Sequence, residues 1–526
     1  MKKIVAVYIF FILFLFFTLQ CTPPSGSHNG GDGDNMGTPS TLNYLWSKRI
    51  GGLNDDFGNG ITVDSNNNLI ITGIIAGDAD LNGDGDYLDN GESYSGYGDR
   101  DIFITKYDSN NTYLWSKRFG GVDTDGGSSV ITDSNNDIII TGHIEGEADL
   151  NGDGDRTDTG ESFIGFGYED IIIIKINSEG TYQWSKRLGG ITNDYGYKIV
   201  SDSNNNIYIT ARIYGDVDLN GDGDNTDGGA ESGTGYAFQD VALVKFNSSG
   251  IYQWAKRIGG VNNENGIGIK TDSNNNVIIT GWAAGDADLN GDGDYLDPGE
   301  VATGYDNTDI FIVKFNSSGT YLWSKRLGGL NYDYGNGIAV DSDDNLIITG
   351  SIRENVDLNG DGDYLDNGEP YSGYDKDDIF IVKFNSSGTY LWSKRLGGLN
   401  YDNGNYLISD SNNNIYITGY IEGNADLNGD GDSNDGNGES GTGYGDKDAF
   451  IIKFNSDGIS QGYKRLGGTN ADMGNEIALD SNNHIVIIGK IYGNVDLNGD
   501  GDSNDGNGES GTGYAGSDIF IAGYSN

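Results

Sequence analysis

Oxygen-bearing side chains recur at fixed spacing in a stretch that occurs seven times in the chain. One copy reads D-L-N-G-D-G-D-Y-L-D-N-G-E, from Asp357 to Glu369. Copies follow one another every 69 or 70 residues, beginning at Asp80, Asp149, Asp218, Asp288, Asp357, Asp426 and Asp496. Carboxylates that alternate around a glycine, on a loop that bends sharply there, can converge on one point. About six to eight oxygens at one point suit Ca²⁺, and the stretch contains no competing His or Cys.

The pattern therefore predicts about one Ca²⁺ per repeat, bound by six side chains in each copy. The candidate metal ligands are Asp80, Asn82, Asp84, Asp86, Asp89 and Glu92; Asp149, Asn151, Asp153, Asp155, Asp158 and Glu161; Asp218, Asn220, Asp222, Asp224, Asp227 and Glu231; Asp288, Asn290, Asp292, Asp294, Asp297 and Glu300; Asp357, Asn359, Asp361, Asp363, Asp366 and Glu369; Asp426, Asn428, Asp430, Asp432, Asp435 and Glu439; Asp496, Asn498, Asp500, Asp502, Asp505 and Glu509. The alternative is a solvated acidic loop of Asn-Gly and Asp-Gly turns. Seven carboxylate clusters without counter-ions would repel one another, which favours calcium.

The spacing resembles that of the EF-hand and related Asp-rich calcium loops, D-x-[DN]-x-[DN]-G, over this stretch alone. That resemblance implies the type of ligand. The closing Glu lies at the thirteenth position in four copies and at the fourteenth in three, whereas an EF-hand has it at the twelfth. Because the flanking residues are typical of strands, we expect no helix-loop-helix.

The N-terminus has the features of an export signal. Lys2 and Lys3 precede an apolar run from Ile4 to Leu19, as in a secretory signal peptide. Cys21, the only cysteine, resembles the acylated residue of a bacterial lipoprotein, although Gln20 stands where a small residue is usual. We predict a signal peptide at 1–20, then lipidated Cys21 and a flexible tether over 21–42. The alternative is an uncleaved membrane helix. The protein is expected to be exported and lipid-anchored to the bacterial membrane, in the periplasm or at the cell surface.

Residues 43–526 form one array of seven repeats. Each repeat contains four apolar segments of five to eight residues, rich in Ile, Val, Phe and Tyr and bounded by Gly, Asn, Ser or Asp, which is typical of strands. Four-stranded units repeated radially predict an all-β fold, a seven-bladed β-propeller with four antiparallel strands per blade. A solenoid needs atypical capping repeats at its ends, and here the terminal repeats match the middle ones.

Three segments of each repeat match a known family in register. The patterns W-x-K-x-x-G-G, G-x-x-x-D-S-x-x-N-x-x-I-x-G and D-x-F-x-x-K-x-x-x-x-G resemble the bacterial SBBP (seven-bladed β-propeller) repeat over nearly all of residues 43–526. The resemblance implies a propeller and little about biochemical activity. The acidic insert lies outside the basic repeat, so its role depends on its own chemistry.

The order of the segments predicts how the ring closes. We place the GIAVDS segment innermost, followed outward by LIITG, DIFIVKF and TYLWSKR. The final blade would then lack its outer strand, and residues Tyr44 to Arg49 would supply it beside Ile519 to Tyr524, a 1+3 closure. The rival register puts the Trp strand innermost, in the blade of Ile61 to Ser65. In the first register all acidic inserts and Gly-Gly loops share one face, where we expect partners to dock.

Other polar residues recur at fixed positions, and we expect most of them to be structural. The seven Lys-Arg pairs of the Trp strand are expected to meet acids of neighbouring blades. The seven acids that follow the Gly-Gly pairs, beginning with Asp56, either ring the mouth of the central channel or, more in keeping with their type, fix the loop by accepting backbone N–H groups. Asp64 and its equivalents open turns.

No catalytic constellation emerges from the sequence. The three histidines, His28, His143 and His484, do not share a repeat position. A net charge of −49 and a pI near 4.1 argue against nucleic acid and anionic lipid surfaces as partners. Departures from repeat symmetry look mild, such as Gly462 for Trp, Ala211 for Gly and Gly523 for Lys.

An enzyme usually breaks repeat symmetry, because one active site needs one unusual blade. The sequence thus favours a non-enzymatic, calcium-binding surface lipoprotein, a monomer whose propeller binds a glycan or an extracellular protein. The membrane is reached only through the lipid anchor. The alternative is a calcium-dependent propeller enzyme that acts on polysaccharide or phosphate esters.

Overall fold

The computed structural model describes the ring of repeats and part of each acidic insert. The described residues are 42–87, 92–93, 98–153, 155–156, 161, 167–225, 229–233, 238–295, 297, 299–301, 307–364, 369, 376–433, 439–441, 445–500, 502–503, 508–511 and 516–526. The expected signal peptide, Cys21 and nearly all of the tether lie outside this range. Within it, no helix is long and apolar enough to cross a membrane.

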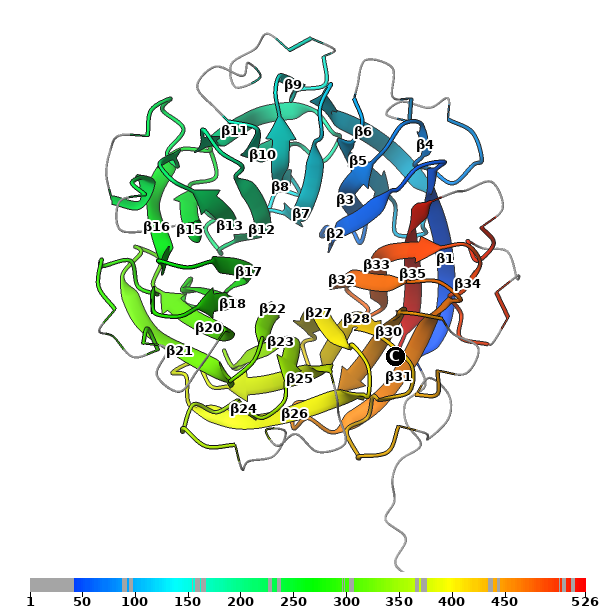
Figure 1. The fold of residues 1–526 in the computed structure, drawn as a ribbon. Coiled ribbons are helices and arrows are strands. Elements are labelled where there is room, and N and C mark those ends of the chain that lie inside the picture. Colours follow the sequence, from blue (N-terminus) through cyan, green and yellow to red (C-terminus); the bar gives the residue numbers. More distant parts are fainter. Residues whose placement is uncertain are drawn as a thin grey trace, which may run out of the picture. The chain divides into compact units, whose positions relative to one another are not determined.

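Seven antiparallel sheets are arranged in a ring around a central axis, so the predicted seven-bladed propeller is confirmed (Figure 1). From the axis outward the blades are as follows. Blade 1 has β2 (Phe57–Val63), β3 (Leu69–Ile75), β5 (Asp101–Tyr107) and β6 (Tyr113–Gly121); blade 2 has β7 (Gly126–Thr132), β8 (Ile138–Glu145), β10 (Glu169–Ile176) and β11 (Tyr182–Gly190); blade 3 has β12 (Tyr195–Ser201), β13 (Ile207–Tyr214), β15 (Gln239–Phe246) and β16 (Tyr252–Gly260); blade 4 has β17 (Glu264–Thr271), β18 (Val277–Ala284), β20 (Thr308–Phe315) and β21 (Tyr321–Gly329). Blade 5 has β22 (Tyr334–Val340), β23 (Leu346–Arg353), β25 (Asp377–Phe384) and β26 (Tyr390–Gly398); blade 6 has β27 (Asn403–Ser409), β28 (Ile415–Ile421), β30 (Asp448–Phe454) and β31 (Ser460–Gly468); blade 7 has β32 (Met473–Leu479), β33 (Ile485–Tyr492), β35 (Ser517–Ser525) and β1 (Asn43–Gly52).

Each sheet also has a fifth strand of two residues, which the sequence did not predict. These strands are β4 (Ala79–Asp80), β9 (Ala148–Asp149), β14 (Val217–Asp218), β19 (Ala287–Asp288), β24 (Val356–Asp357), β29 (Ala425–Asp426) and β34 (Val495–Asp496). Each begins the acidic insert of one blade and pairs with the outer strand of the preceding blade, so β4 of blade 1 pairs with β1 of blade 7. We call this pairing the insert latch.

The Gly-Gly pair of the Trp strand makes the latch possible. Gly51 and Gly52 pair with Asp80 and Ala79. A Cβ on Gly52 would lie 2.2 Å from the Asp78 carbonyl oxygen, and Gly51 has φ +138°, so neither position accepts a side chain without distortion. The glycines therefore allow two blades to approach at the outer rim.

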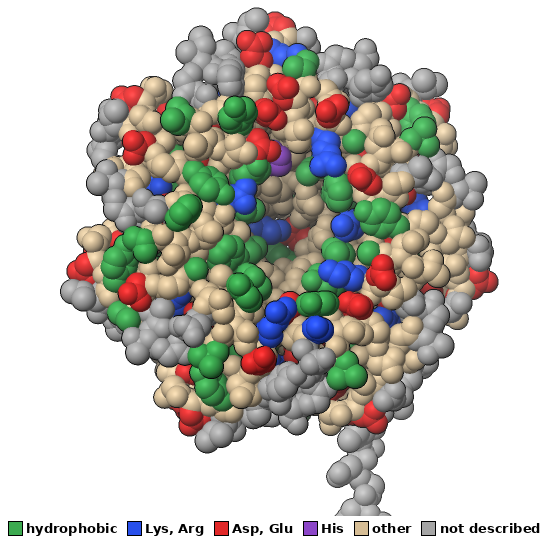
Figure 2. Space-filling model, in the orientation of Figure 1, with side chains coloured by type: hydrophobic (Ala, Val, Ile, Leu, Met, Phe, Trp, Pro, Cys, Tyr) green, Lys and Arg blue, Asp and Glu red, His purple; other side chains and the backbone are tan. Residues whose placement is uncertain are grey.

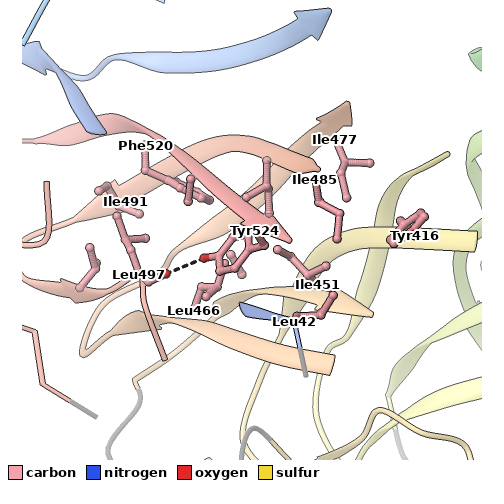
Figure 3. Packing of buried hydrophobic residues seen from close by; sticks show 14 residues of the cluster. Leu42, Tyr416, Ile451, Leu466, Ile477, Ile485, Ile491, Leu497, Phe520 and Tyr524 are labelled. Carbon is pink, nitrogen blue, oxygen red and sulfur yellow. Dashed lines mark hydrogen bonds between the residues drawn. The ribbon is translucent and has the colours of Figure 1, made fainter. Parts of the chain in front are cut away.

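The predicted 1+3 closure is confirmed. Strand β1 pairs with β35 from Asn43↔Ser525 to Ile50↔Ile519, and the rival register is wrong because Ile61 belongs to β2 in another blade. Buried residues from blades 6 and 7 pack beside this junction (Figure 3). In that cluster Tyr524 donates a 2.5 Å hydrogen bond to the Leu497 carbonyl, which ties β35 to the insert of its own blade (Figure 3). Leu42 is buried in the same cluster.

The Arg of each Lys-Arg pair holds its own blade together, so the prediction of contacts with neighbouring blades is wrong for Arg. Arg118 of β6 forms a buried ion pair with Asp101 of β5, with 3.0 Å between Nη1 and Oδ2. It also donates to the carbonyl of Gly77, where the insert begins, at 2.7 Å. The paired Lys does face the neighbouring blade: the charge of Asp80 in the latch acts on Lys48, whose pKa is lowered by burial.

The acids after the Gly-Gly pairs fix loops, as the more conservative of the two interpretations predicted. Asp56 is fully buried and accepts the N–H groups of Gly52 at 2.7 Å and Ala76 at 2.8 Å. It thereby joins the Gly-Gly loop to the end of β3. Burial raises the pKa of Asp56 to about 7.

The face opposite the inserts is built from short turns. Asp64 accepts the N–H groups of Asn66 and Asn68 at 2.9 Å, which confirms the turn-forming role. The sequence did not indicate its ion pair with Lys106 of the same blade, at 3.0 Å. The side-chain oxygen of Asn136 accepts the N–H of Ser65 in the preceding blade at 3.0 Å, a contact that recurs between other blades. Hydrogen bonds thus link successive turns on this face.

Candidate functional site

The described part of each insert is a closed loop. The side chain of Asp80 accepts the N–H groups of Gly83 at 2.5 Å and Gly85 at 2.9 Å. The buried closing residue Glu92 accepts the Leu81 N–H at 3.0 Å, and the Glu92 carbonyl accepts from Ala79. The bond from the Leu N–H to the closing Glu recurs in all seven copies. The closing Glu is thus brought back to the first Asp, as a cation loop requires.

The structure places the remaining candidate ligands as follows. Asn82 and Asp84 each accept the N–H of the residue two positions later, Asp84 and Asp86, at 2.7 and 3.0 Å. Six candidates lie outside the described residues: Asp89, Asp158, Asp227, Asp366, Asp435 and Asp505. Within the described part of the chain, no group of three or more His, Cys, Asp or Glu side chains is arranged to hold a metal ion. The hydrogen bonds of Asp80, Asn82 and Asp84 to N–H groups order the loop backbone.

The repeats differ from one another in the residues that face the channel. In each blade, one residue of the innermost strand pairs with the fourth residue of the second strand. These residues are Gly60, Ser129, Lys198, Gly268, Gly337, Tyr406 and Glu476. The position two residues later is apolar or Thr in six blades and Lys270 in blade 4. Charged or polar side chains from four blades therefore occupy two strand positions at which the other blades have Gly, Ser, Thr or apolar residues.

These four side chains meet inside the channel. Lys198 and Glu476 form an ion pair of 3.0 Å, and Lys270 donates to the Tyr406 hydroxyl at 3.0 Å. They line a cavity of about 170 Å³ whose remaining wall is mostly Ile and Val, including Ile61, Ile199 and Ile338. Burial lowers the pKa of Lys270, and the charge of Glu476 opposes that shift. Burial and Glu476 both raise the pKa of Tyr406.

Basic residues that the repeat does not fix gather around this channel. Of the 31 Lys and Arg residues, 14 form the Lys-Arg pairs, six occupy one position of the third strand and two lie at the N-terminus. The remaining nine are Arg100, Arg156, Lys198, Arg212, Lys270, Arg353, Lys376, Lys447 and Lys490. Lys198 and Lys270 lie in the channel, and Arg156 lies in an insert. The other six lie on the insert face, at or next to the ends of strands, and Figure 2 shows Lys and Arg side chains around the central hollow.

We call the insert-face ends of the two inner strands of each blade the channel mouth. One position here carries a different residue in every blade: Ile74, His143, Arg212, Trp282, Ser351, Tyr420 and Lys490. Arg212 lies 4.1 Å from the centroid of the Tyr195 ring, and that ring is 5.0 Å from His143. Burial and the charge of Arg212 lower the pKa of His143 to about 4. The mouth therefore presents packed aromatic rings and cations.

Similar contacts continue around the mouth. Lys447 lies 3.9 Å from the centroid of the Tyr420 ring, and the rings of Trp282 and Tyr334 meet edge to face at 5.9 Å. Lys490 and Arg100 both lie within 6 Å of the Phe57 ring. Aromatic residues and Arg are enriched in binding surfaces, because they combine a large contact area with polar groups.

Exposed aliphatic side chains add to the insert face. In six blades the residue after the Gly-Gly pair is aliphatic and more than half exposed: Leu53, Val122, Ile191, Val261, Leu330 and Leu399. The seventh blade has Thr469 there. Ile191, at 76 % exposure, is the most exposed of the six. The insert face thus combines apolar and basic groups in a chain that is otherwise strongly acidic.

The sequence interpretation missed the variable side chains of the channel and of its mouth. It judged departures from repeat symmetry by Gly462, Ala211 and Gly523, which are mild. Comparing the seven inner strands position by position would have revealed Lys198, Lys270, Tyr406 and Glu476. The periodic alternation of strand residues does not say which variable positions face one another across the ring, so their contact needed the structure.

Comparison with known proteins agrees with the repeat pattern. Residues 45–75, 183–217, 322–355 and 391–425 match the family model SBBP, described as a beta-propeller repeat. Four segments of the chain are therefore similar to the SBBP repeat. These SBBP segments all begin in the Trp strand and extend through the two inner strands of the next blade.

Two curated proteins are similar to this chain. An uncharacterized WD repeat-containing protein of Acanthamoeba polyphaga mimivirus is 26 % identical over 517 residues, which cover 85 % of this chain and 36 % of the relative. The regulatory protein FlaEY of Caulobacter vibrioides is 27 % identical over 121 residues, which cover 23 % of this chain and 12 % of the relative. The chain thus spans about a third or less of the length of these relatives.

Solved structures resemble the ring only weakly. A gluconolactonase from Xanthomonas campestris is 9 % identical with a TM-score of 0.32, covering 93 % of this chain and 98 % of that one. A catalytically inactive virginiamycin B lyase from Staphylococcus aureus is 10 % identical with a TM-score of 0.37, covering 90 % and 99 %. Likenesses at these scores carry no conclusion about the site.

Proposed function

We propose that the protein is a non-enzymatic propeller scaffold that binds a glycan or a protein ligand at the channel mouth on its insert face. One observation carries the proposal: residues that differ between blades, and basic residues that the repeat does not fix, gather at the mouth. Residues that only build the fold repeat in every blade, as Asp56 and Arg118 do. The residues of the mouth differ between blades, so the fold does not require any one of them. Their aromatic and basic side chains suit contact with a ligand.

The electrostatics support the same surface. The chain has a net charge of −49, and basic side chains that the repeat does not fix, such as Arg212 and Lys490, lie at the mouth. These side chains can pair with an acidic part of a ligand near the centre of the ring, whereas the acidic inserts at the rim would repel it. The exposed aliphatic residues, such as Ile191 and Leu53, would then bury apolar surface around the basic centre.

A binding role fits the mouth better than the enzymatic alternative. His143, the one histidine in the described part of the mouth, packs on Tyr195, and its lowered pKa keeps it neutral at pH 7. The Arg353 guanidinium is paired with Asp377 at 2.6 Å. These contacts fix the shape of the surface and resemble a recognition surface more than a nucleophile with its general base.

The binding proposal is tested with variants that change charge on the two faces. Arg212→Glu and Lys490→Glu remove positive charge from the mouth, and Asp363→Lys reverses a charge on an insert of the same face. For a ligand identified on a glycan and matrix-protein array, each mouth variant is expected to weaken binding about tenfold or more, because a charged contact is lost and a repulsive one is introduced. Asp363→Lys is expected to change the affinity as well. Surface plasmon resonance measures the affinities.

The matched control for this test lies on the opposite face. A double Ser317→Glu and Ser318→Glu variant changes the charge by the same two units as Arg212→Glu, at exposed turn residues. Its affinity should equal that of the unmodified protein. Equal losses from both faces would refute docking at the mouth.

We further propose that each insert holds one Ca²⁺ and that lipidated Cys21 anchors the protein outside the cytoplasm. The recurrent bonds that bring the closing Glu back to the first Asp support the calcium proposal, because they bring carboxylates from both ends of the loop together. One ion per repeat would bring the net charge to about −35 and so reduce self-repulsion.

Calcium is expected to raise the melting temperature. With affinities of about 10⁻⁴ to 10⁻³ M, as in extracellular calcium modules, a tenfold excess over Kd stabilises each occupied site by about 1.4 kcal/mol. Melting curves in excess calcium and in chelator measure the effect, and Mg²⁺ at the same concentration controls for general screening. Superimposable curves in calcium and chelator would contradict the proposal.

A further inference from the structure

The cluster inside the channel contains two Lys side chains and one Glu side chain, so it has one more positive than negative charge. Lys198 is paired with Glu476 at 3.0 Å, and the Glu476 carboxylate also accepts the backbone N–H of Ile61 at 3.3 Å. Lys270 has a neutral partner, the Tyr406 hydroxyl. Among the described residues no carboxylate lies within ion-pair distance of Lys270, so two ammonium groups share one carboxylate.

This excess charge lies in an unfavourable place. The cavity of about 170 Å³ is walled mainly by aliphatic side chains from all seven blades. An ammonium group that leaves water for such surroundings loses solvation, and only a nearby anion restores it. The lowered pKa of Lys270 has this same cause.

The cluster is not a requirement of the fold. At the position of Lys198 three blades have Gly, and at the position of Lys270 the other six blades have Ile twice, Ala twice, Thr and Val. Blades with these small or apolar residues form the same strands and pair in the same register. The fold therefore does not require a lysine at this position, and we infer that Lys270 has a role other than packing in this chain of net charge −49.

We propose that the channel is a binding site for one small anion of the carboxylate or phosphate class, held by Lys270 and Lys198 in the cavity. Lys270 has donors beyond the one it gives to Tyr406, and Lys198 supplies a second positive charge. The basic residues of the mouth lie along the path from the insert face and draw anions toward it. The proposal does not depend on which macromolecule docks at the mouth.

The test titrates the full protein by calorimetry with sodium glucuronate, glucose 6-phosphate, inorganic phosphate, acetate and neutral glucose. We expect one anion per ring and no binding of glucose. Glucuronate against glucose 6-phosphate distinguishes a carboxylate site from a phosphate site, and acetate and inorganic phosphate show whether the sugar contributes. Failure of all four anions to bind would overturn the proposal.

Two variants change the channel charge in opposite directions. Lys270→Met keeps the length of the side chain and removes its charge, and it should weaken anion binding about tenfold or more, as expected for loss of a charge-assisted hydrogen bond. Glu476→Gln keeps the shape and removes the competing carboxylate, so it should strengthen binding. Variants that merely damaged the fold would both lose affinity.

Unchanged affinity in Lys270→Met, or weaker binding in Glu476→Gln, would show that the lysine serves only to close the channel. If Lys270→Met fails to fold, the sign of the Glu476→Gln effect alone decides. Ser318→Ala, on the opposite face, should bind the anion as the unmodified protein does.

Discussion

Removal of residues 43–50 is expected to destabilise the entire ring. These residues supply most of β1, which pairs with β35 along its length and holds the β4 latch through Gly51 and Gly52. Without β1, β35 becomes an unpaired edge and the buried Ile50 is lost. The lost ladder bonds and apolar burial amount to about 5 to 10 kcal/mol. Calorimetry should show a single transition at lower temperature.

A matched pair of substitutions tests the closure without a deletion. Ile50 of β1 and Ile258 of β16 occupy the same repeat position, and both are fully buried. Ile50→Ala should lower the free energy of unfolding as much as Ile258→Ala does, by about 2 to 5 kcal/mol. The reason is that β1 packs in its blade like the outer strand of a blade built from one continuous segment. A neutral Ile50→Ala beside a costly Ile258→Ala would refute the closure, as would a deletion variant that melts like the complete protein.

The melting temperature is expected to rise as the pH falls from 8 to about 5.5. Two buried carboxyls approach each Gly-Gly pair, and one Arg faces them. At Gly51 they belong to Asp56 and Asp518, whose pKa values burial raises to about 7 and about 8. An unfolded Asp has a pKa of about 3.9, so the folded chain binds more protons between these values. Their contribution to stability is therefore fully present below about pH 4 and is lost as the pH rises through 7 to 8.

The other blades behave in the same way, since burial raises the pKa of Asp194 to about 7 and of Asp402 to about 8. The turn residues Asp64 and Asp341 have lowered pKa values, and their contribution is lost only at still lower pH. Summed over seven blades, we expect a shift of about 5 to 10 °C, measured in chelator. Because buried groups are weakly screened, the shift should persist in 1 M NaCl. A flat profile, or one abolished by salt, would contradict this origin.

The fold could be predicted from the sequence because each strand carries its own signal. The GIAVDS, LIITG, DIFIVKF and TYLWSKR segments are short, apolar and bounded by turn residues, and their order fixed both the inner-to-outer sequence of strands and the 1+3 closure. The latch could not be predicted, because Ala79 and Asp80 are too few to form a recognisable strand. Their pairing depends on how closely Gly52 lets the next blade approach.

The candidate site was only partly predictable. The acidic inserts, as in Asp80 to Glu92, were recognisable because ligand-type residues alternate within one continuous stretch. The ion pair of Lys198 with Glu476 joins blades 3 and 7 across the channel, and nothing local in either strand indicates the other. The partner of Arg118 was mispredicted for a related reason. A strand pattern indicates which face of the sheet a side chain lies on, but not whether a long side chain will reach an acid of its own blade or of the next.

The two pairings of β1, with β4 and with β35, also suggest the order in which they form during folding. Its latch partner β4 lies in the insert that follows the next two strands, whereas its ladder partner β35 comes from the final repeat. A chain that folds as it emerges can therefore clip Gly51 and Gly52 to Ala79 and Asp80 early and complete the ladder only when residues 517–525 arrive. Contacts between such distant segments form slowly, so we expect ring closure to be the last step of assembly. Until then, pairing with β4 would hold β1 beside the first blade, where β35 later pairs with it.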